Sequence, residues 1–218
     1  MPLSKFDLSV IERLGPAYLI GVDEAGRGPL AGPVAAAAAY IPPAARPFLH
    51  EIDDSKKLTE KKRVLLLAHM RAHGVRFGFG CAGPGEIDSF NILGATFRAM
   101  SRAVTRLTAD LGAGPGEALV LVDGPHRIKG LSLRQEAVVR GDQRSLSIAA
   151  ASIFAKVVRD RWMEELDRRH PGYGLAVHKG YGTKAHLAAL TALGPSPAHR
   201  LSFAPVRASV KDREAAQA

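Results

Sequence analysis

Three short segments that resemble strands are each followed by acidic residues, and this arrangement constrains the fold more than any other feature of the sequence. The segments and their acids are residues 18–22 with Asp23 and Glu24, residues 118–122 with Asp123, and residues 136–140 with Asp142 after Gly141. Short apolar runs bounded by Gly, Pro and Asp are typical of buried strands. Because ligands of α/β folds bind beyond the carboxyl ends of strands, these acids mark the expected site.

Residues 34–40 contain five consecutive alanines between Pro33 and Pro42. Alanine favours a helix by intrinsic propensity. The flanking prolines leave room for only a short element, so a buried central strand is equally compatible with the pattern. We expect a strand that pairs with residues 18–22, and a short helix is the alternative.

Helical patterns separate the strands. The expected helices are residues 60–73 after the cap Thr59, residues 87–107 before Gly112, residues 146–169 after the cap Ser145, and residues 184–193 before Gly194, with one more strand at residues 77–82. This order predicts an α/β fold, a mixed sheet covered by helices, with a helical C-terminal part from about residue 160. For 218 residues we expect one domain, residues 1–218, with a frayed tail over residues 211–218.

The charge of the chain favours a polyanionic partner. Lys and Arg number 30 against 21 Asp and Glu, a formal net charge of +9 that is spread along the sequence. The single cysteine, Cys81, excludes an internal disulfide and a thiolate zinc site, which favours the reducing cytoplasm. The longest apolar run, residues 34–41, is shorter than the ~20 residues of a membrane helix. We expect a soluble, cytoplasmic monomer that binds nucleic acid.

Acids at the ends of three strands predict a metal site. A single acid in such a place is commonly a turn residue. Several carboxylates held together repel one another unless a cation shares them, and oxygen ligands without a Cys or His cluster suit Mg²⁺ or Mn²⁺. In a basic protein this set favours phosphodiester hydrolysis by two metal ions about 4 Å apart. The turn Gly26-Arg27-Gly28 beside the acids lets a nucleic-acid backbone approach closely.

Residues 23–28, DEAGRG, followed by GPV at residues 32–34, resemble the signature of the ribonuclease HII family. Further segments resemble blocks of that family in the family's order. They are DSKKL at 54–58, VDG at 122–124, GD at 141–142, SIAAASI at 147–153, AK at 155–156, RD at 159–160 and HKGYGT at 178–183. The resemblance covers about residues 18–186.

The resemblance implies a ribonuclease H-like fold and hydrolysis of the RNA strand of RNA–DNA hybrids. It also implies incision 5′ to a ribonucleotide embedded in duplex DNA, leaving 3′-hydroxyl and 5′-phosphate ends. By the same resemblance the catalytic, metal-binding acids are Asp23, Glu24, Asp123 and Asp142, and the substrate-binding residues are Gly26, Arg27, Gly28, Lys179 and Tyr181. The glycine turn would read the ribose 2′-hydroxyl, the group that distinguishes RNA from DNA. Tyr181 would lie near it and stack on the next deoxyribose.

Other polar residues receive weaker assignments. The remaining candidates for phosphate contacts are Lys56, Lys57, Arg144 and Lys184. Asp53 is a possible extra metal ligand, whereas Asp54 is expected to anchor a turn. Asp160 is left out of the site because Arg159 and Arg161 favour an intrahelical ion pair. His178 and His186 lack the partners of a zinc site.

The segment after Pro195 matches no motif of the family. Its Arg200 and Arg207 either bind the duplex or are solvated. Some relatives dock on a replication clamp through a short terminal peptide, and residues 206–218 show no hydrophobic-aromatic version of one. Clamp docking therefore stays undecided.

Two alternatives stay open. One is a nuclease of the same fold without ribose selectivity, which the glycine turn and Tyr181 disfavour. The other is a non-catalytic hybrid-binding protein. Four retained acids disfavour it, because a pure phosphate binder gains nothing from negative charge beside its ligand.

Overall fold

The computed structural model describes residues 3–52, 55 and 57–217, with side chains as far as residue 210. The interpretations of Asp53, Asp54 and Lys56 lie outside the described residues. The strands are β1 (Tyr18–Ala25), β2 (Val34–Tyr40), β3 (Arg76–Ala82), β4 (Ala118–Asp123) and β5 (Arg134–Val138). The helices are α1 (Leu3–Leu14), α2 (Glu60–Ala72), α3 (Pro84–Leu111), α4 (Leu146–Arg169), α5 (Leu175–His178), α6 (Lys184–Leu193) and α7 (Ala204–Gln217), with 3₁₀ turns η1 (Pro43–Phe48) and η2 (Gly141–Gln143).

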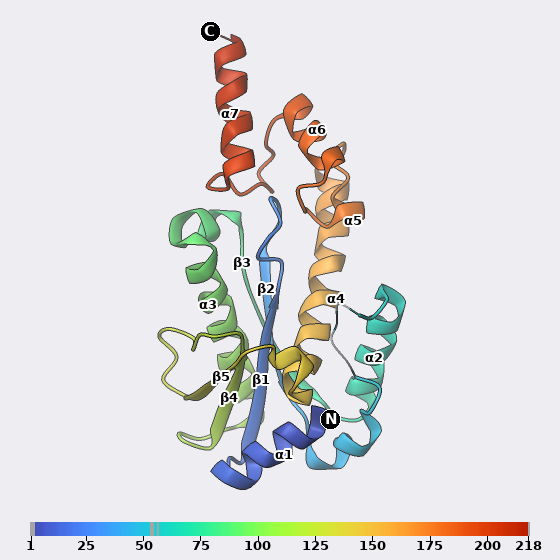
Figure 1. Ribbon diagram of the computed structural model, residues 1–218, viewed down its shortest axis with the longest axis vertical. Helices are drawn as coiled ribbons and strands as arrows, with labels where there is room; N and C mark the ends of the chain where they lie inside the picture. The colour runs from blue at the N-terminus through green and yellow to red at the C-terminus, as the bar shows by residue number, and fades with distance from the viewer. Residues whose placement is uncertain (1–2, 53–54, 56, 218) are drawn as a thin grey trace.

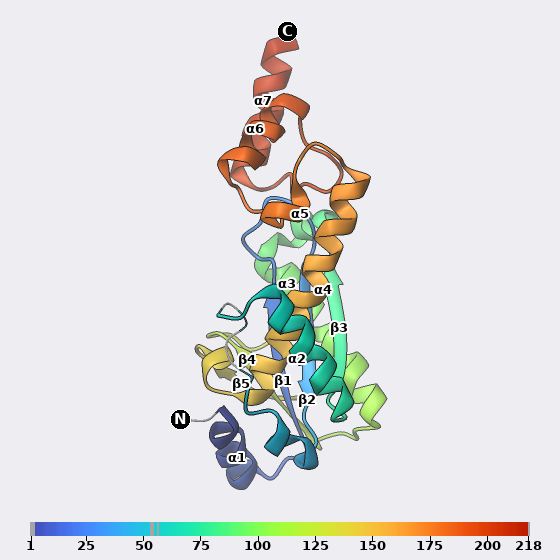
Figure 2. The same ribbon diagram turned by 90° about the vertical axis from the view of Figure 1, so that its right-hand side faces the viewer.

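The strands form one mixed sheet in the order β3-β2-β1-β4-β5. The β1–β2 and β2–β3 pairs are antiparallel, and β1–β4 and β4–β5 are parallel. Helix α3 covers one face, and α4 with α2 covers the other (Figures 1 and 2). The predicted mixed sheet covered by helices is therefore confirmed.

Strand β2 is buried on both faces, and this burial explains its alanines. Ala36 and Ala38 pack in the cluster that includes α3, whereas Ala37 and Ala39 pack in the cluster that includes α4. Successive strand residues face opposite sides of a sheet, so both helices meet only methyl groups there. The predicted strand is correct, because packing between two helices overrides the helix propensity of alanine.

Glycines bring both helices close to the sheet. A Cβ on Gly21 of β1 would lie 2.1 Å from the backbone carbon of Ser147 in α4. On the other face, a Cβ on Gly80 of β3 would lie 2.0 Å from the carbonyl oxygen of Ala99 in α3. Any larger residue at these positions would push a helix off the sheet.

Side-chain caps fix where the helices begin. Thr59 Oγ1 accepts the Lys62 N–H and Ser145 Oγ accepts the Ile148 N–H, as the sequence predicts for α2 and α4. Helix α3 differs from the expected continuous helix, because Asn91 interrupts it with φ 55° and ψ 169°. Its Oδ1 accepts the N–H groups of Leu93 and Gly94, each at 3.0 Å, and so recaps the second part of the helix.

Helices α5, α6 and α7 gather at one end of the molecule, beyond the long helix α4 (Figures 1 and 2). Helix α7 continues to Gln217, where the sequence suggests a frayed tail. Residues 211–217 are Ala, Lys, Glu, Arg, Gln and one Asp, most of them strong helix formers. Among the described residues, no helix is long and apolar enough to span a membrane.

Gly21→Ala should destabilise the protein by about 3 kcal/mol, because the new Cβ would overlap the backbone of α4. For a chain of this size that loss lowers Tm by roughly 10 °C in a thermal melt. Gly85→Ala is the matched control, since a Cβ there has no neighbour within 4 Å and lies in the helical backbone of α3. Equal melting temperatures for the two variants would contradict the close approach of α4 to β1.

Candidate active site

Parallel pairing of β1 and β4 places two acids side by side. Val22 lies opposite Val122 in the register, so Asp23 and Asp123 follow at the same level. Alternation along each strand gives both acids the same face, on which Ile148 of α4 packs against Leu121. The prediction that strand ends bring these carboxylates together is consistent with this register.

The acids line a pocket of about 240 Å³. Three of the four predicted acids contribute to it, Asp23, Glu24 and Asp123, together with the turn at residues 25–28. The other lining residues are Ser55, Ser152, Lys156, Arg159 and Tyr181. The structure therefore joins the predicted turn and the predicted tyrosine to the acids, although Tyr181 lies more than 150 residues after Asp23 and Glu24 in the sequence.

The surroundings of Asp23 disfavour a negative charge on its carboxyl group. It is only 4% exposed, and its Oδ1 accepts the N–H of Glu24 at 2.7 Å. Burial raises its pKa well above the ordinary value, and the negative charges of Glu24 and Asp123 raise it further. Hydrogen bonds from Ser152 and from the Glu24 N–H oppose these effects. The ionised form of Asp23 thus needs a cation nearby.

Glu24 and Asp123 are oriented by neighbouring donors. The Arg27 guanidinium lies 3.4 Å from Glu24 Oε1, and the Gly141 N–H donates to Asp123 Oδ1 at 2.6 Å. Glu24 and Asp123 also border a second, smaller pocket against Phe97 of α3. The two carboxylates therefore lie between the main pocket and the α3 side of the sheet.

Asp142 is buried and does not line the main pocket. It belongs to η2, is 3% exposed, and its N–H lies 3.4 Å from Asp123 Oδ1. The structure places it beside Asp123 but not among the residues that line the main pocket. Its role as a metal ligand stays a prediction.

The chemistry of this acid set suits a hard divalent cation. Asp23, Glu24 and Asp123 share one pocket, and the mutual repulsion that raises the pKa of Asp23 is the repulsion a cation would relieve. Within the part of the chain that the structure describes, no three His, Cys, Asp or Glu side chains already converge on one point. A cation bound in the shared pocket would offset the repulsion among the three carboxylates.

Buried arginines hold the glycine turn. Arg200 donates to the carbonyl oxygens of Gly26 and Arg27 at 2.6 and 2.9 Å. Gly26 has φ +95°, and a Cβ on it would lie 1.9 Å from Arg159 Nε. Arg200 is 0% exposed, so both sequence-based alternatives for it, a duplex contact and a solvated side chain, are wrong. No sequence motif marks this role of Arg200, because its partners are backbone atoms far along the chain.

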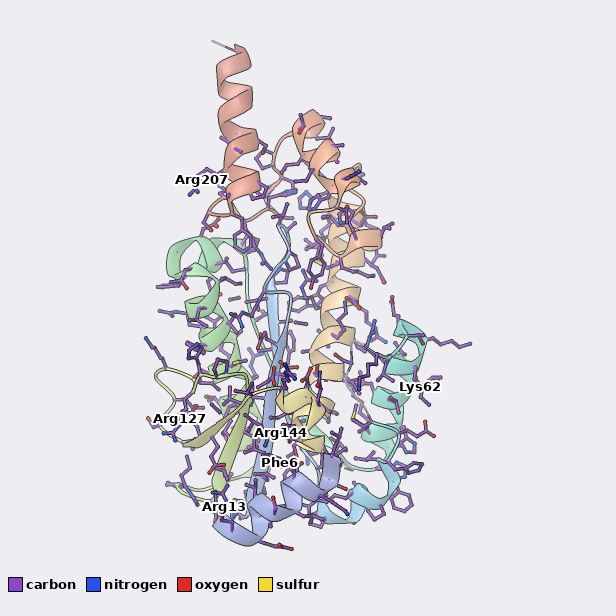
Figure 3. All side chains as sticks on the ribbon, in the orientation of Figure 1. Phe6, Arg13, Lys62, Arg127, Arg144 and Arg207 are labelled. Carbon is purple, nitrogen blue, oxygen red and sulfur yellow. The ribbon has the colours of Figure 1, made fainter. Side chains whose placement is uncertain are left out.

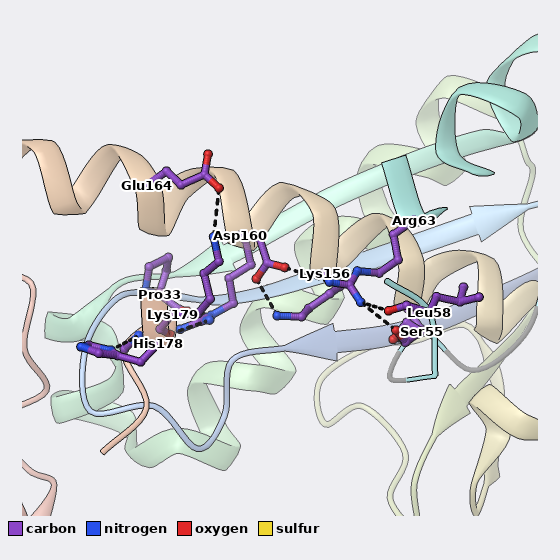
Figure 4. Close-up of polar contacts among 12 residues, drawn as sticks. Pro33, Ser55, Leu58, Arg63, Lys156, Asp160, Glu164, His178 and Lys179 are labelled. Atoms are coloured by element: carbon purple, nitrogen blue, oxygen red, sulfur yellow. Dashed lines mark hydrogen bonds and ion pairs between the residues drawn. The ribbon is translucent and has the colours of Figure 1, made fainter. Parts of the chain in front are cut away.

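Tyr181 faces the glycine turn across the pocket. Half of the side chain is exposed, and its Cε1 lies 3.5 Å from the position that a Cβ on Gly28 would take. Lys179, in contrast, is absent from the pocket wall. Its ammonium pairs with Glu164 of α4 at 2.9 Å, and its carbonyl accepts a hydrogen bond from Arg159 (Figure 4). Both the ammonium and the carbonyl group of Lys179 therefore bind other parts of the protein.

Helix α4 contributes three pocket residues to which the sequence analysis assigned no role. Ser152, Lys156 and Arg159 are spaced by four and three positions, which places them on one helical face. Their helical spacing, within segments that resemble the family, is the feature of the sequence that could have predicted their place in the pocket. Ser152 Oγ is 2.8 Å from Ser55 Oγ, which ties the loop before α2 to the pocket.

Asp160 takes part in an ion-pair network beside the pocket. It pairs with Lys156 four residues earlier in α4, at 2.6 Å, and with Arg63 of α2, at 3.5 Å. Arg63 also donates to the carbonyl oxygens of Ser55 and Leu58 (Figure 4). An intrahelical pair was expected with Arg159 or Arg161, and the actual helical partner is Lys156, one turn away.

Arg144, a predicted phosphate ligand, and Arg207, a possible duplex contact, lie outside the pocket wall. Arg144 stacks on Phe6 of α1, with its guanidinium carbon 4.9 Å from the ring centroid, and Figure 3 shows both residues near the N-terminal helix. Arg207 is exposed on α7 (Figure 3). Neither lines the pocket of the acids.

Comparison with known proteins identifies relatives along nearly the whole chain. The family described as Ribonuclease HII matches residues 20–206. Ribonuclease HII of Oleidesulfovibrio alaskensis is 46% identical over 94% of this chain and 86% of its own. Ribonuclease HII of Geotalea daltonii is 48% identical over 97% of this chain and 94% of its own.

Solved structures show the same fold at lower identity. The ribonuclease H2 of Pyrococcus horikoshii superposes with a TM-score of 0.69 at 23% identity, over 90% of this chain and 99% of that one. Bst-RNase HIII in complex with Mn²⁺ gives a TM-score of 0.69 at 21% identity, over 94% of this chain and 73% of that one.

Gly26→Ala should cost on the order of 3 kcal/mol of stability, because it strains a left-handed residue and displaces the buried Arg159. Gly28→Ala is the matched control two residues away, where a Cβ makes only an ordinary contact with Tyr181. Thermal melts of both variants would check this. A Gly26→Ala protein with the melting temperature of wild type would show that Arg159 does not pack against the turn.

Proposed function

Because the chain belongs to the ribonuclease HII family, we propose that it is an endonuclease that hydrolyses the RNA strand of RNA–DNA hybrids and incises 5′ to ribonucleotides embedded in duplex DNA. The products would carry 3′-hydroxyl and 5′-phosphate ends. The observation that carries the proposal is the single pocket in which paired strand-end acids, the glycine turn and Tyr181 meet. We further propose that residues 1–218 act as one catalytic domain, as a monomer in the cytoplasm.

We propose Asp23, Glu24, Asp123 and Asp142 as the residues that hold divalent metal, either Mn²⁺ or Mg²⁺, in a two-ion site. The bound ions would supply an activated water and stabilise the leaving oxygen. The chain supplies the negative charge and its orientation, through the Glu24 N–H on Asp23 and the Gly141 N–H on Asp123. Burial of Asp23 keeps bulk water from competing for the ligand oxygens.

Selectivity for ribose follows from the opposite wall of the pocket. The backbone at Gly26, Arg27 and Gly28 would meet the 2′-hydroxyl, and the exposed ring of Tyr181 would stack on the next sugar. The absence of a side chain at Gly28, where a Cβ would meet only Tyr181, lets a nucleic-acid backbone approach these N–H groups. A nuclease without ribose selectivity has no use for this wall.

Asp23→Asn should reduce cleavage on the order of a thousandfold while leaving substrate binding largely intact, because it removes a metal ligand and not a phosphate contact. The assay uses a labelled DNA duplex with one ribonucleotide, with Mg²⁺, with Mn²⁺ and with chelator, beside an all-DNA duplex. Asp110→Asn is the control, an acid in an exposed ion pair with Arg76. Normal turnover by Asp23→Asn would refute the metal assignment.

The same assay on the wild-type protein separates the alternatives. Metal-dependent incision 5′ to the ribonucleotide, with the all-DNA duplex intact, supports the proposal. Cutting of both duplexes favours a nuclease without ribose selectivity, and binding without cutting in either metal favours a non-catalytic hybrid-binding protein.

Tyr181→Ala should lower the rate at a single embedded ribonucleotide by about 10- to 100-fold, the effect of losing one stacking contact. Tyr181→Phe keeps the ring and removes the hydroxyl, so it separates stacking from hydrogen bonding. Single-turnover rates on the one-ribonucleotide duplex measure both. A wild-type rate for Tyr181→Ala would exclude a role in reading the junction.

A further inference from the structure

The segment that follows Pro195 is bound through its backbone to residues 30–32, which follow the glycine turn and also contact Gly180. The Gly32 N–H donates to the carbonyl of Ala198 at 2.8 Å, and the Arg200 N–H donates to the carbonyl of Leu30 at 2.9 Å. Between these bonds, Ala31 forms an isolated bridge with His199. The Leu30 N–H in turn donates to the carbonyl of Gly180, next to Tyr181. Residues 198–200 therefore belong to a small backbone network that links residues 30–32 with Gly180.

Arg200 orients the backbone donors of the glycine turn. Each of its three guanidinium nitrogens donates to a carbonyl oxygen, those of Gly32, Arg27 and Gly26, at 2.6 to 2.9 Å. In a trans peptide the C=O and the following N–H point in opposite directions. Because the carbonyls of Gly26 and Arg27 are turned toward the buried Arg200, the N–H groups of Arg27 and Gly28 are turned away from it, and Arg200 itself does not line the pocket.

His199 reaches Tyr181 through a second histidine. The Ser196 N–H donates to His199 Nδ1 at 3.0 Å, so this nitrogen carries no proton and Nε2 does. His199 Nε2 lies 3.1 Å from His186 Nε2, which must then accept. His186 Nδ1 is left as the donor to the carbonyl oxygen of Tyr181, at 2.9 Å. The chain of bonds thus fixes one neutral tautomer for each ring.

The surroundings of the two rings favour this neutral state. His186 and His199 are both buried, His178 stacks on His186 at 4.4 Å, and Tyr173 packs on His199 at 4.8 Å. His178 is itself tied, with Nδ1 accepting the Gly180 N–H and Nε2 facing the Tyr173 carbonyl. The charged or titratable groups that act on the pair are His178, His170 and each other. Of these described groups none is negatively charged.

From these contacts we propose that His199 and Arg200 are positioning residues that hold the glycine turn and Tyr181 at a fixed separation across the pocket. Arg200 sets the turn, and His199 sets the tyrosine loop through His186. The proposal rests on the proposed function of this pocket, because it assigns the two elements to substrate reading. Two consecutive residues on one bridged segment move together, so any displacement of the segment changes both walls of the pocket.

The tautomers can be observed without any activity. Long-range ¹H–¹⁵N spectra of histidine-labelled protein at pH 7.5 should show His199 protonated on Nε2 and His186 on Nδ1, with His199→Gln and His186→Asn assigning the signals. The opposite tautomer at either ring, or a charged ring, would overturn the histidine arm of the proposal.

Acidification should break the hydrogen bond between His199 and His186. Burial, followed by the neighbouring His186, lowers the pKa of His199 from 6.5 to about 4. The pKa of His199 is lower in the folded protein than in the unfolded chain. As pH falls from the unfolded-state pKa toward the folded-state pKa, the unfolded chain binds the proton first, so the folded protein loses stability over this range. The Tm of wild type should therefore fall more between pH 6.5 and pH 4 than that of His199→Phe.

Kinetics test the positioning role. Arg200→Lys keeps the charge but loses the planar fork, and His199→Phe keeps a ring but loses the donor. Each should lower the single-turnover rate at one embedded ribonucleotide by about 10- to 100-fold, the scale expected for a misplaced reacting group. Affinity for Mn²⁺ alone, measured by calorimetry, should stay within about threefold of wild type, because no metal ligand is changed. Arg13→Lys, an exposed arginine on α1 that pairs with Glu136, is the matched control.

The outcomes are separable. Wild-type rates for both variants, or a loss of Mn²⁺ affinity that parallels the loss of rate, would overturn the positioning role. If Arg200→Lys does not fold, His186→Asn and His186→Phe decide, since the amide of Asn replaces the Nδ1 donor and should retain more activity than Phe. Failure of the wild-type protein to cut at a ribonucleotide would refute the proposed function, whereas the tautomer spectra would still test the hydrogen-bond chain.

Discussion

Two carboxylates at the ends of neighbouring parallel strands are the constraint on which the rest of the structure depends. The register of β1 and β4 forces Asp23 and Asp123 to the same level, and α4 closes over Asp23. Their repulsion and burial work against folding. The close contacts of α3 and α4 with the sheet, made possible by alanines and glycines, supply packing that holds the acids in place.

The pocket is assembled from two kinds of element with different physical tasks. The sheet and η2 carry the acids, and their geometry follows from strand pairing and backbone hydrogen bonds. The opposite wall is made of loops, the glycine turn and the segment around Tyr181, which have no regular hydrogen bonding of their own. Buried arginine and histidine side chains supply the missing bonds to their carbonyl groups.

Local patterns in the sequence predict the parts of this protein that local chemistry determines. Thr59 and Ser145 cap their helices as expected, and the strand ends lead to the acids. The interruption at Asn91 was not predicted, because only this one residue leaves the helical conformation and the apolar residues on both sides of it keep helical spacing. The place of Arg200 could not be predicted, because its partners are carbonyl groups more than 160 residues away and carry no signal in the sequence.

The same distinction explains why charge alone was a poor guide to individual residues. The net charge of +9 indicates a polyanionic partner for the whole surface. Arg159 and Arg200 belong to that count, yet both are buried and bound to backbone oxygens. A guanidinium offers five donors in a rigid plane, so one side chain can satisfy several carbonyl groups of an irregular loop. For these two arginines, hydrogen-bonding capacity and not attraction to phosphate is the property that the fold uses.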